Sequence, residues 1–231
     1  MTDSQIEEAF KGSLFMSSEP AMDLVQRGYG NLIGVDVSDF DGVVINGETF
    51  DGTTGCSCAK QNNSRCLTLS DNKTEVLSYN YAKERESAKI ISPAVTVYHR
   101  DDGKLSVVYC GEPWAKFNYM EGFAFLNETR KKQFIDLLTR VDALPVYYDG
   151  DNEICMRAGY IKDGRLLVAL FNLSYDPLES TNLYLKDKPS EISIVNSDGS
   201  ETLVGYTEEK DDKYCIDVRV EPMYPVILLV K

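Results

Sequence analysis

The sequence predicts an α+β, β-rich protein made of two units. Residues 1–144 are expected to form a small α/β or β-rich unit with a few helices, and residues 145–231 an antiparallel β-sandwich. Three observations support this class. Helix-like patterns occur only before residue 144, short hydrophobic runs separated by turn sequences follow it, and 231 residues with 43% hydrophobic content are enough to bury a core.

The N-terminal segment predicts two helices and a strand. Residues 4–11 have the composition of a short acidic helix. A second helix is expected after Ser17 or Ser18, because serine is a favoured N-cap, and to end at Gly28, because glycine commonly follows the last helical turn. Residues 32–37 are apolar enough for a strand.

The central segment combines a polar loop with strands. Residues 38–66 are rich in Gly, Asp, Ser, Thr and Asn, with short strands expected near 43–45 and 66–69. Alternation predicts a strand over 74–82. The clearest hairpin joins 94–98 to 105–109 through Asp101-Asp102-Gly103, whose residues tolerate a left-handed backbone.

Residues 127–141 give the strongest helix pattern. Asn127 is placed to cap it, the apolar residues of this segment share one face, and Pro145 stops it. The basic run Arg130-Lys131-Lys132 is expected to be a solvated face of this helix. We therefore expect the first unit to end just after this helix, near residue 144.

Beyond residue 145 the pattern changes to short strands and Asx-Gly turns, typical of an antiparallel sandwich. The expected strands cover 154–161, 166–173, 181–185, 192–195, 202–206, 214–220 and 226–230.

Charge and targeting signals exclude several classes of function. A net charge of −13 and a pI near 4.6 disfavour binding to nucleic acid or to an anionic membrane surface. The sequence contains no apolar run of membrane-spanning length and no signal peptide. We therefore expect a cytoplasmic protein with no cofactor.

Few residues form a reactive pattern. Cys56, Cys58 and Cys66 lack a fourth zinc ligand, so we expect reduced structural thiols and no metal site. The pattern most similar to a nucleophile with its base is Cys110 together with the single histidine, His99. The pairs Asp39/Asp41 and Asp149/Asp151 are expected to be turn residues. The sequence thus predicts no catalytic residue.

One aromatic loop is a candidate sugar-binding surface. Aromatic faces stack on sugar rings, and neighbouring amides and carboxylates bind hydroxyl groups. The alternative is that these aromatic residues pack inside the protein or between its units. The tentative ligand-binding residues are Trp114, Phe117, Asn118, Tyr119 and Glu121.

The last third of the chain resembles the C-terminal β-domain of bacterial glycoside hydrolases, including the family 42 β-galactosidases. The matching features are Arg157 on one strand, the run Phe171-Asn172-Leu173-Ser174 ending the next, and the final strand after Pro225 in EPMYPVILLV. From the residues alone, Arg157 is expected to pair with an acid across the sheet, and Asn172 to satisfy backbone groups at a turn.

The first two thirds resemble the tail of the amidotransferase-like α/β domain that precedes this β-domain. The matching segments are AMDLVQRGYGNLIGV, SPAVTVYHRDDGKLSVVYCG and FAFLNETRKKQFIDLL. The resemblance implies that the catalytic acid and nucleophile belong to a separate N-terminal (β/α)8 barrel, and that the amidotransferase-like domain helps to build the oligomer.

Three functions follow from these observations. The first is a non-catalytic accessory and assembly region of a glycoside-hydrolase-like protein, whose partners are the missing N-terminal catalytic domain or further copies of itself. This hypothesis predicts an apolar surface where the missing parts dock. The second is a free-standing carbohydrate-binding module that uses the aromatic loop. The third is a cysteine-dependent amidotransferase-like enzyme, which requires Cys110 or another cysteine beside His99.

Overall fold

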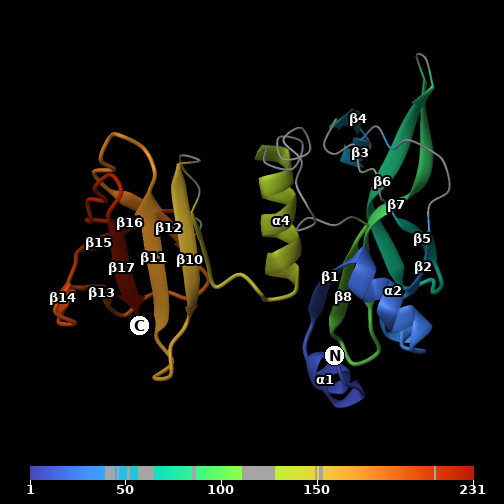
Figure 1. Cartoon of the computed structure of the whole chain (residues 1–231), viewed down its shortest axis with the longest axis horizontal. Helices are drawn as coiled ribbons and strands as arrows, with labels where there is room; N and C mark the ends of the chain where they lie inside the picture. The colour runs from blue at the N-terminus through green and yellow to red at the C-terminus, as the bar shows by residue number, and fades with distance from the viewer. Residues whose placement is uncertain are drawn as a thin grey trace. The chain divides into compact units, whose positions relative to one another are not determined.

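The chain divides into two compact units, Met1–Ala143 and Leu144–Lys231, next to the expected boundary (Figure 1). Strands dominate both units, which confirms the predicted α+β, β-rich class. The computed structural model describes residues 1–39, 45, 47–50, 53–56, 65–84, 87–110, 128–148, 150, 153–210 and 212–231.

Unit 1 is built around a sheet whose described strands have the order β1-β8-β7-β6-β3-β4. β1 and β8 run parallel, and the other neighbours are antiparallel. The strands of this unit are β1 (Leu14–Ser17), β2 (Val35–Asp39), β3 (Gly47–Phe50), β4 (Thr53–Cys56), β5 (Arg65–Leu69), β6 (Thr74–Glu84), β7 (Ser87–His99) and β8 (Leu105–Tyr109).

Both faces of this sheet are covered around β1, β8 and the end of β7 that pairs with β8 (Figure 1). Helix α4 (Glu128–Arg140) buries Leu137 and Phe134 against Val95, Val97 and Val107 on one face. The other face is covered by α1 (Asp3–Ala9), α2 (Ser18–Gln26), the short 3-10 helix η1 (Gly30–Leu32) and the β2–β5 pair. The hydrophobic cluster on this α1–α2 side of the sheet includes Ile6, Leu24, Ile33, Val35, Leu67 and Val108.

Local signals explain the helix ends. A capping box starts α1, because the Thr2 hydroxyl accepts from Gln5 N at 3.3 Å and Thr2 N donates to Gln5 Oε1 at 2.9 Å. Ser17 is the N-cap of α2, but its side chain makes no capping hydrogen bond. Gly28 has a φ of 86° and follows the last turn of α2, as predicted.

The predicted hairpin is confirmed. The strand expected at residues 32–37 begins later than the sequence predicts. Arg100 N donates to Lys104 O at 3.0 Å around the β7–β8 turn. Residues 30–32 form η1, so the strand expected at 32–37 is β2 and starts at Val35. Gly34 between them has a φ of 69°, and an added Cβ would lie 2.4 Å from Thr74 Oγ1, so only glycine fits this turn.

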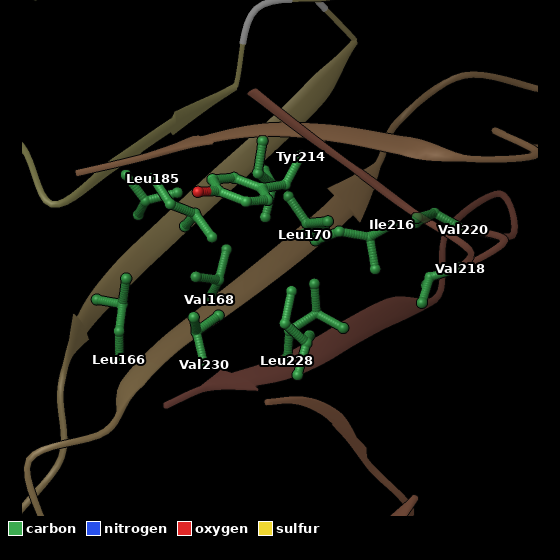
Figure 2. Close-up of a cluster of buried hydrophobic side chains, with 13 residues drawn as sticks. Leu166, Val168, Leu170, Leu185, Tyr214, Ile216, Val218, Val220, Leu228 and Val230 are labelled. Carbon is green, nitrogen blue, oxygen red and sulfur yellow. The ribbon is translucent and has the colours of Figure 1, made fainter. Parts of the chain in front are cut away.

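Unit 2 consists of two antiparallel sheets packed through one core (Figure 2). The first has the order β10-β11-β17-β13-β14 and the second β15-β16-β12-β9. Alternate residues such as Leu166, Val168 and Leu170 point into the core, whereas their neighbours face outward. The strands are β9 (Val146–Tyr148), β10 (Ile154–Tyr160), β11 (Leu166–Asn172), β12 (Thr181–Leu185), β13 (Ile192–Val195), β14 (Glu201–Leu203), β15 (Tyr206–Glu208), β16 (Lys213–Ile216) and β17 (Pro225–Val230).

Two of the expected C-terminal strands differ from the structure. The single strand expected over 202–206 is two strands, β14 and β15, which belong to different sheets. The strand expected over 214–220 ends at Ile216, and Val220 then makes only an isolated bridge to Leu178. β9 was not expected from the sequence.

Candidate functional site

The aromatic loop that is the candidate sugar site lies outside the described residues. This applies to Trp114, Phe117, Asn118, Tyr119 and Glu121. It also applies to Asp41, Asp149, Asp151, Cys58 and the helix cap Asn127. Their proposed roles remain predictions.

Cys110 and His99 do not form a thiol–imidazole pair. His99 faces Leu105 at the start of β8, whereas Cys110 follows the end of β8 and its amide donates to Ala94 O. Because Leu105 lies opposite His99, Cys110 is five residues farther along the chain than that pair. At about 3.3 Å per strand residue, this places the two side chains about 16 Å apart along the strand. His99 is exposed and lies 3.7 Å from the Glu75 carboxylate.

The environment of Cys110 also opposes a nucleophilic role. The side chain is 1% exposed and packs in the cluster on the α1–α2 side of the sheet. Burial raises the pKa of the thiol to about 12, whereas a catalytic thiol needs a lowered pKa. The hypothesis of a Cys110–His99 enzyme is therefore wrong.

A buried polar cluster joins α4 to the sheet of unit 1. Arg130 Nη1 donates to Glu48 Oε2 at 2.5 Å, and Gln133 Nε2 donates to Glu48 Oε1 at 2.6 Å. The Ser78 hydroxyl donates to the same carboxylate. The side chains of Arg130 and Glu48 are only 2% and 4% exposed, and the guanidinium lies over the Tyr109 ring at 5.2 Å.

This cluster corrects the expectation that Arg130-Lys131-Lys132 is a solvated face. Lys132 is exposed, but Arg130 is among the most buried side chains. A signal was present in the sequence, since Arg130 lies four residues before Phe134, in the helical stripe that buries Leu137 and Val141. The Glu48 carboxylate accepts from Arg130, Gln133 and Ser78 inside the protein, so the cluster attaches a helix to a sheet.

Exposed aromatic residues gather at one end of unit 2. Tyr175 and Tyr224 are 93% and 72% exposed and lie in the turns that follow β11 and precede β17. These turns are neighbours, because Met223 N donates to Asn172 O at 2.8 Å. A hollow of about 150 Å³ lies at the first of these turns, and its lining includes Glu153, Asn172, Ser174 and Asp176.

Asn172 holds this end together, as predicted. Its side-chain amide donates to Asp176 O at 2.8 Å and to Val220 O at 3.0 Å. Its side-chain oxygen accepts from Ser174 N at 2.9 Å. The residue is 1% exposed, so its role is to satisfy backbone groups at the turn.

Arg157 does not form the expected pair with an acid. Its partner across the β10–β11 ladder is Ala169, and the exposed guanidinium makes no ion pair within the part of the chain that the structure describes. Asp39, expected in a turn, instead ends β2 and pairs with Arg65 of β5.

A second hollow of unit 2, of about 300 Å³, is lined by residues of both of its sheets. Arg165 is one of its charged lining residues, and it binds Asp163 Oδ2 at 2.8 Å and Glu201 Oε2 at 2.7 Å. These hydrogen bonds lower the pKa of both carboxyl groups. Arg165 and Asp163 of this lining are thus engaged in ion pairs.

Within the described ranges, no group of three His, Cys, Asp or Glu side chains is arranged to hold a metal ion. None of the helices that the structure describes is both long and apolar enough to cross a membrane.

Comparison with known proteins gives a match in fold. No family model matches the sequence, and no curated protein matches it. Among solved structures, α-L-fucosidase isoenzyme 2 from Paenibacillus thiaminolyticus superposes on 100% of this chain with a TM-score of 0.59 and 10% sequence identity. The chain spans 39% of the length of that enzyme. The whole two-unit fold therefore has a counterpart within a glycoside hydrolase.

Proposed function

We propose that this chain is a non-catalytic accessory and assembly region of a glycoside-hydrolase-like protein of carbohydrate metabolism. The observation that carries the proposal is the match of the entire chain to about two fifths of an α-L-fucosidase. A match that runs through both units, at 10% identity, points to a shared architecture and not to one common motif.

The chemistry of the described residues supports an accessory role. Glu48 and Arg130 are used inside unit 1, Arg165 is paired with its acids, and Cys110 is buried away from His99. These groups stabilise the fold. Catalysis is assigned to a separate (β/α)8 barrel, as the resemblance to bacterial family 42 β-galactosidases implies, and that assignment is part of the proposal.

The test uses the coding sequence next to this one. We expect it to encode a barrel polypeptide that copurifies with this chain and hydrolyses an aryl glycoside, while this chain alone hydrolyses neither aryl α-L-fucosides nor aryl β-galactosides. Turnover by the purified chain, at a rate that follows its concentration through size-exclusion chromatography, would contradict the proposal.

A second candidate function is carbohydrate binding, which the exposed tyrosines of unit 2 favour. Tyr175 and Tyr224 are exposed aromatic side chains, and the turn that holds Tyr175 also lines a polar hollow. Binding to an oligosaccharide panel should weaken in Tyr175→Ala and Tyr224→Ala, and remain unchanged in Tyr160→Ala, at a similarly exposed tyrosine of β10. Loss of binding in Trp114→Ala instead would assign the sugar surface to the aromatic loop.

A further inference from the structure

Strand β1 lies at the edge of the unit 1 sheet but has the surroundings of an interior strand. It has a strand neighbour, β8, on one side only within the described sheet. Its two faces are both covered, because Leu14 and Met16 pack against the α1–α2 cluster and Phe15 packs on Phe134 of α4 with ring centroids 5.5 Å apart. Parallel strands covered on both faces are typical of sheet interiors.

The edge of β1 lacks two of the usual forms of protection, although the strand is short, with four residues. Its sequence, LFMS, has no charge and no proline, which are the features that prevent exposed edges from pairing with other chains. By contrast, the two edge strands of the five-stranded sheet in unit 2 carry Arg157 and Glu201. The backbone edge of β1 is thus suited to accept another strand.

An apolar hollow of about 380 Å³ lies beside this edge. Side chains of α1, β1 and α2 form its wall, so it belongs entirely to unit 1. A strand that pairs with β1 would place alternate side chains into it, and apolar side chains match this lining. Its main apolar lining residues are Ile6, Phe10, Leu14, Phe15, Met16 and Leu24.

Two occupants of the hollow can be compared, a second copy of this chain and an extended segment of another polypeptide. A second copy pairing β1 with β1 would bring two identical hollows together, and neither copy would supply side chains to fill the other. An extended segment with apolar side chains does two things at once. Its side chains fill the hollow, and its backbone completes the hydrogen bonding of the β1 edge. The matched α-L-fucosidase has 61% of its chain outside the matched part, since this chain covers 39% of it.

We infer that the β1 edge and its hollow are a docking site for an extended apolar strand of the catalytic-domain polypeptide, which adds to the sheet beside β1. The identity of this strand rests on the proposed function. The docking site itself rests on β1 and the hollow.

The test of the site uses a peptide probe. A fluorescent nonapeptide in which valine alternates with threonine between terminal lysines should bind the chain, and the same peptide with N-methyl groups along one backbone edge should bind at least about tenfold more weakly. Leu14→Lys should weaken binding of the first peptide by at least about tenfold, because it places a charge in the hollow. The matched control is Leu203→Lys on β14, where the leucine is 67% exposed, and it should leave binding unchanged.

Hydrogen exchange on the unsubstituted chain decides the matter if Leu14→Lys fails to fold. The peptide should slow exchange at the amides of residues 14–17 and leave those of β14 unchanged. Equal binding of the N-methylated peptide, no slowing at β1, or an equal effect of Leu203→Lys would overturn the inference. A dimer of the free chain with slowed exchange at β1 would also overturn it, by making a second copy the occupant.

Copurification with the barrel polypeptide separates this inference from the proposed function. We expect capture by the unsubstituted chain and Leu203→Lys, and loss of capture by Leu14→Lys. Equal capture by all three would refute docking at β1 and leave the proposed function standing. Peptide binding as described without any capture would contradict the proposed function, and with it the identity of the strand.

Discussion

Removing one member of the buried Glu48–Arg130 pair should strongly destabilise unit 1. Arg130→Met leaves the Glu48 carboxylate 4% exposed without its cation, and among the described residues Gln133 and Ser78 still donate to it. Loss of one partner from a buried pair costs about 3–5 kcal/mol. Since the total stability of a domain is about 5–15 kcal/mol, this loss is a large part of it.

The double variant Glu48→Leu/Arg130→Met should recover most of that loss. Replacing both charges by apolar side chains removes the unpaired ion, so we expect a cost of about 2 kcal/mol or less. If each single loss costs about 3–5 kcal/mol, the coupling energy between the two sites is then at least about 4 kcal/mol. A useful control is Arg140→Met at the exposed end of α4, where the pair with Asp136 contributes about 0.5 kcal/mol or less.

The assay is urea titration with alkylation of Cys110 read by mass spectrometry. This thiol is 1% exposed and belongs to unit 1, so it reacts only when that unit opens and reports unit 1 separately from unit 2. A cost below about 1 kcal/mol for Arg130→Met would refute the reasoning. Additive losses in the double variant would refute it as well.

Three further predictions concern single residues. Because burial raises the pKa of the Cys110 thiol to about 12, its neutral form stabilises the fold below the unfolded pKa of about 8.5, and this contribution is lost as the pH rises toward 12. Urea midpoints should therefore fall less steeply between about pH 9 and 11 in Cys110→Ala than in the unsubstituted chain. Gly34→Ala should cost at least about 2 kcal/mol by urea unfolding, whereas Gly12→Ala, whose added Cβ would be 4.0 Å from its nearest neighbour, should cost under about 1 kcal/mol. Asn172→Ala should lower the melting temperature of unit 2 through a loss of about 2–3 kcal/mol, and equal loss in Asn196→Ala, at an exposed turn, would contradict the role given to Asn172.

Local patterns were sufficient to predict most strands of the fold. The hairpin of β7 and β8 follows from apolar alternation on both sides of an Asp-Asp-Gly turn, and β12 and β13 have the predicted bounds. Alternation and turn chemistry are properties of neighbouring residues, so they are visible without the fold. The same holds for Asn172, whose short side chain bonds to the turn that follows it.

Features that depend on distant residues were not predictable in this way. Arg130 was expected in solvent because its acidic partner lies 82 residues away, on a strand within a segment with a loop-like composition. β14 and β15 were expected as one strand because the pattern records alternation and not which sheet each residue joins. The candidate sugar residues 114–121 stay predictions, because they lie outside the described residues.

The separation of β14 from β15 bears on how unit 2 unfolds. Two adjacent residues join the strands: Val204 N donates to Ile192 O in the first sheet, and Gly205 O accepts from Asp217 N beside the second, both at 3.0 Å. The polypeptide thus passes directly from one sheet to the other, so the two sheets cannot separate while both strands stay paired. Amides on β17 and β12, in opposite layers, should accordingly exchange with solvent through a single opening event, with the same free energy and the same dependence on denaturant.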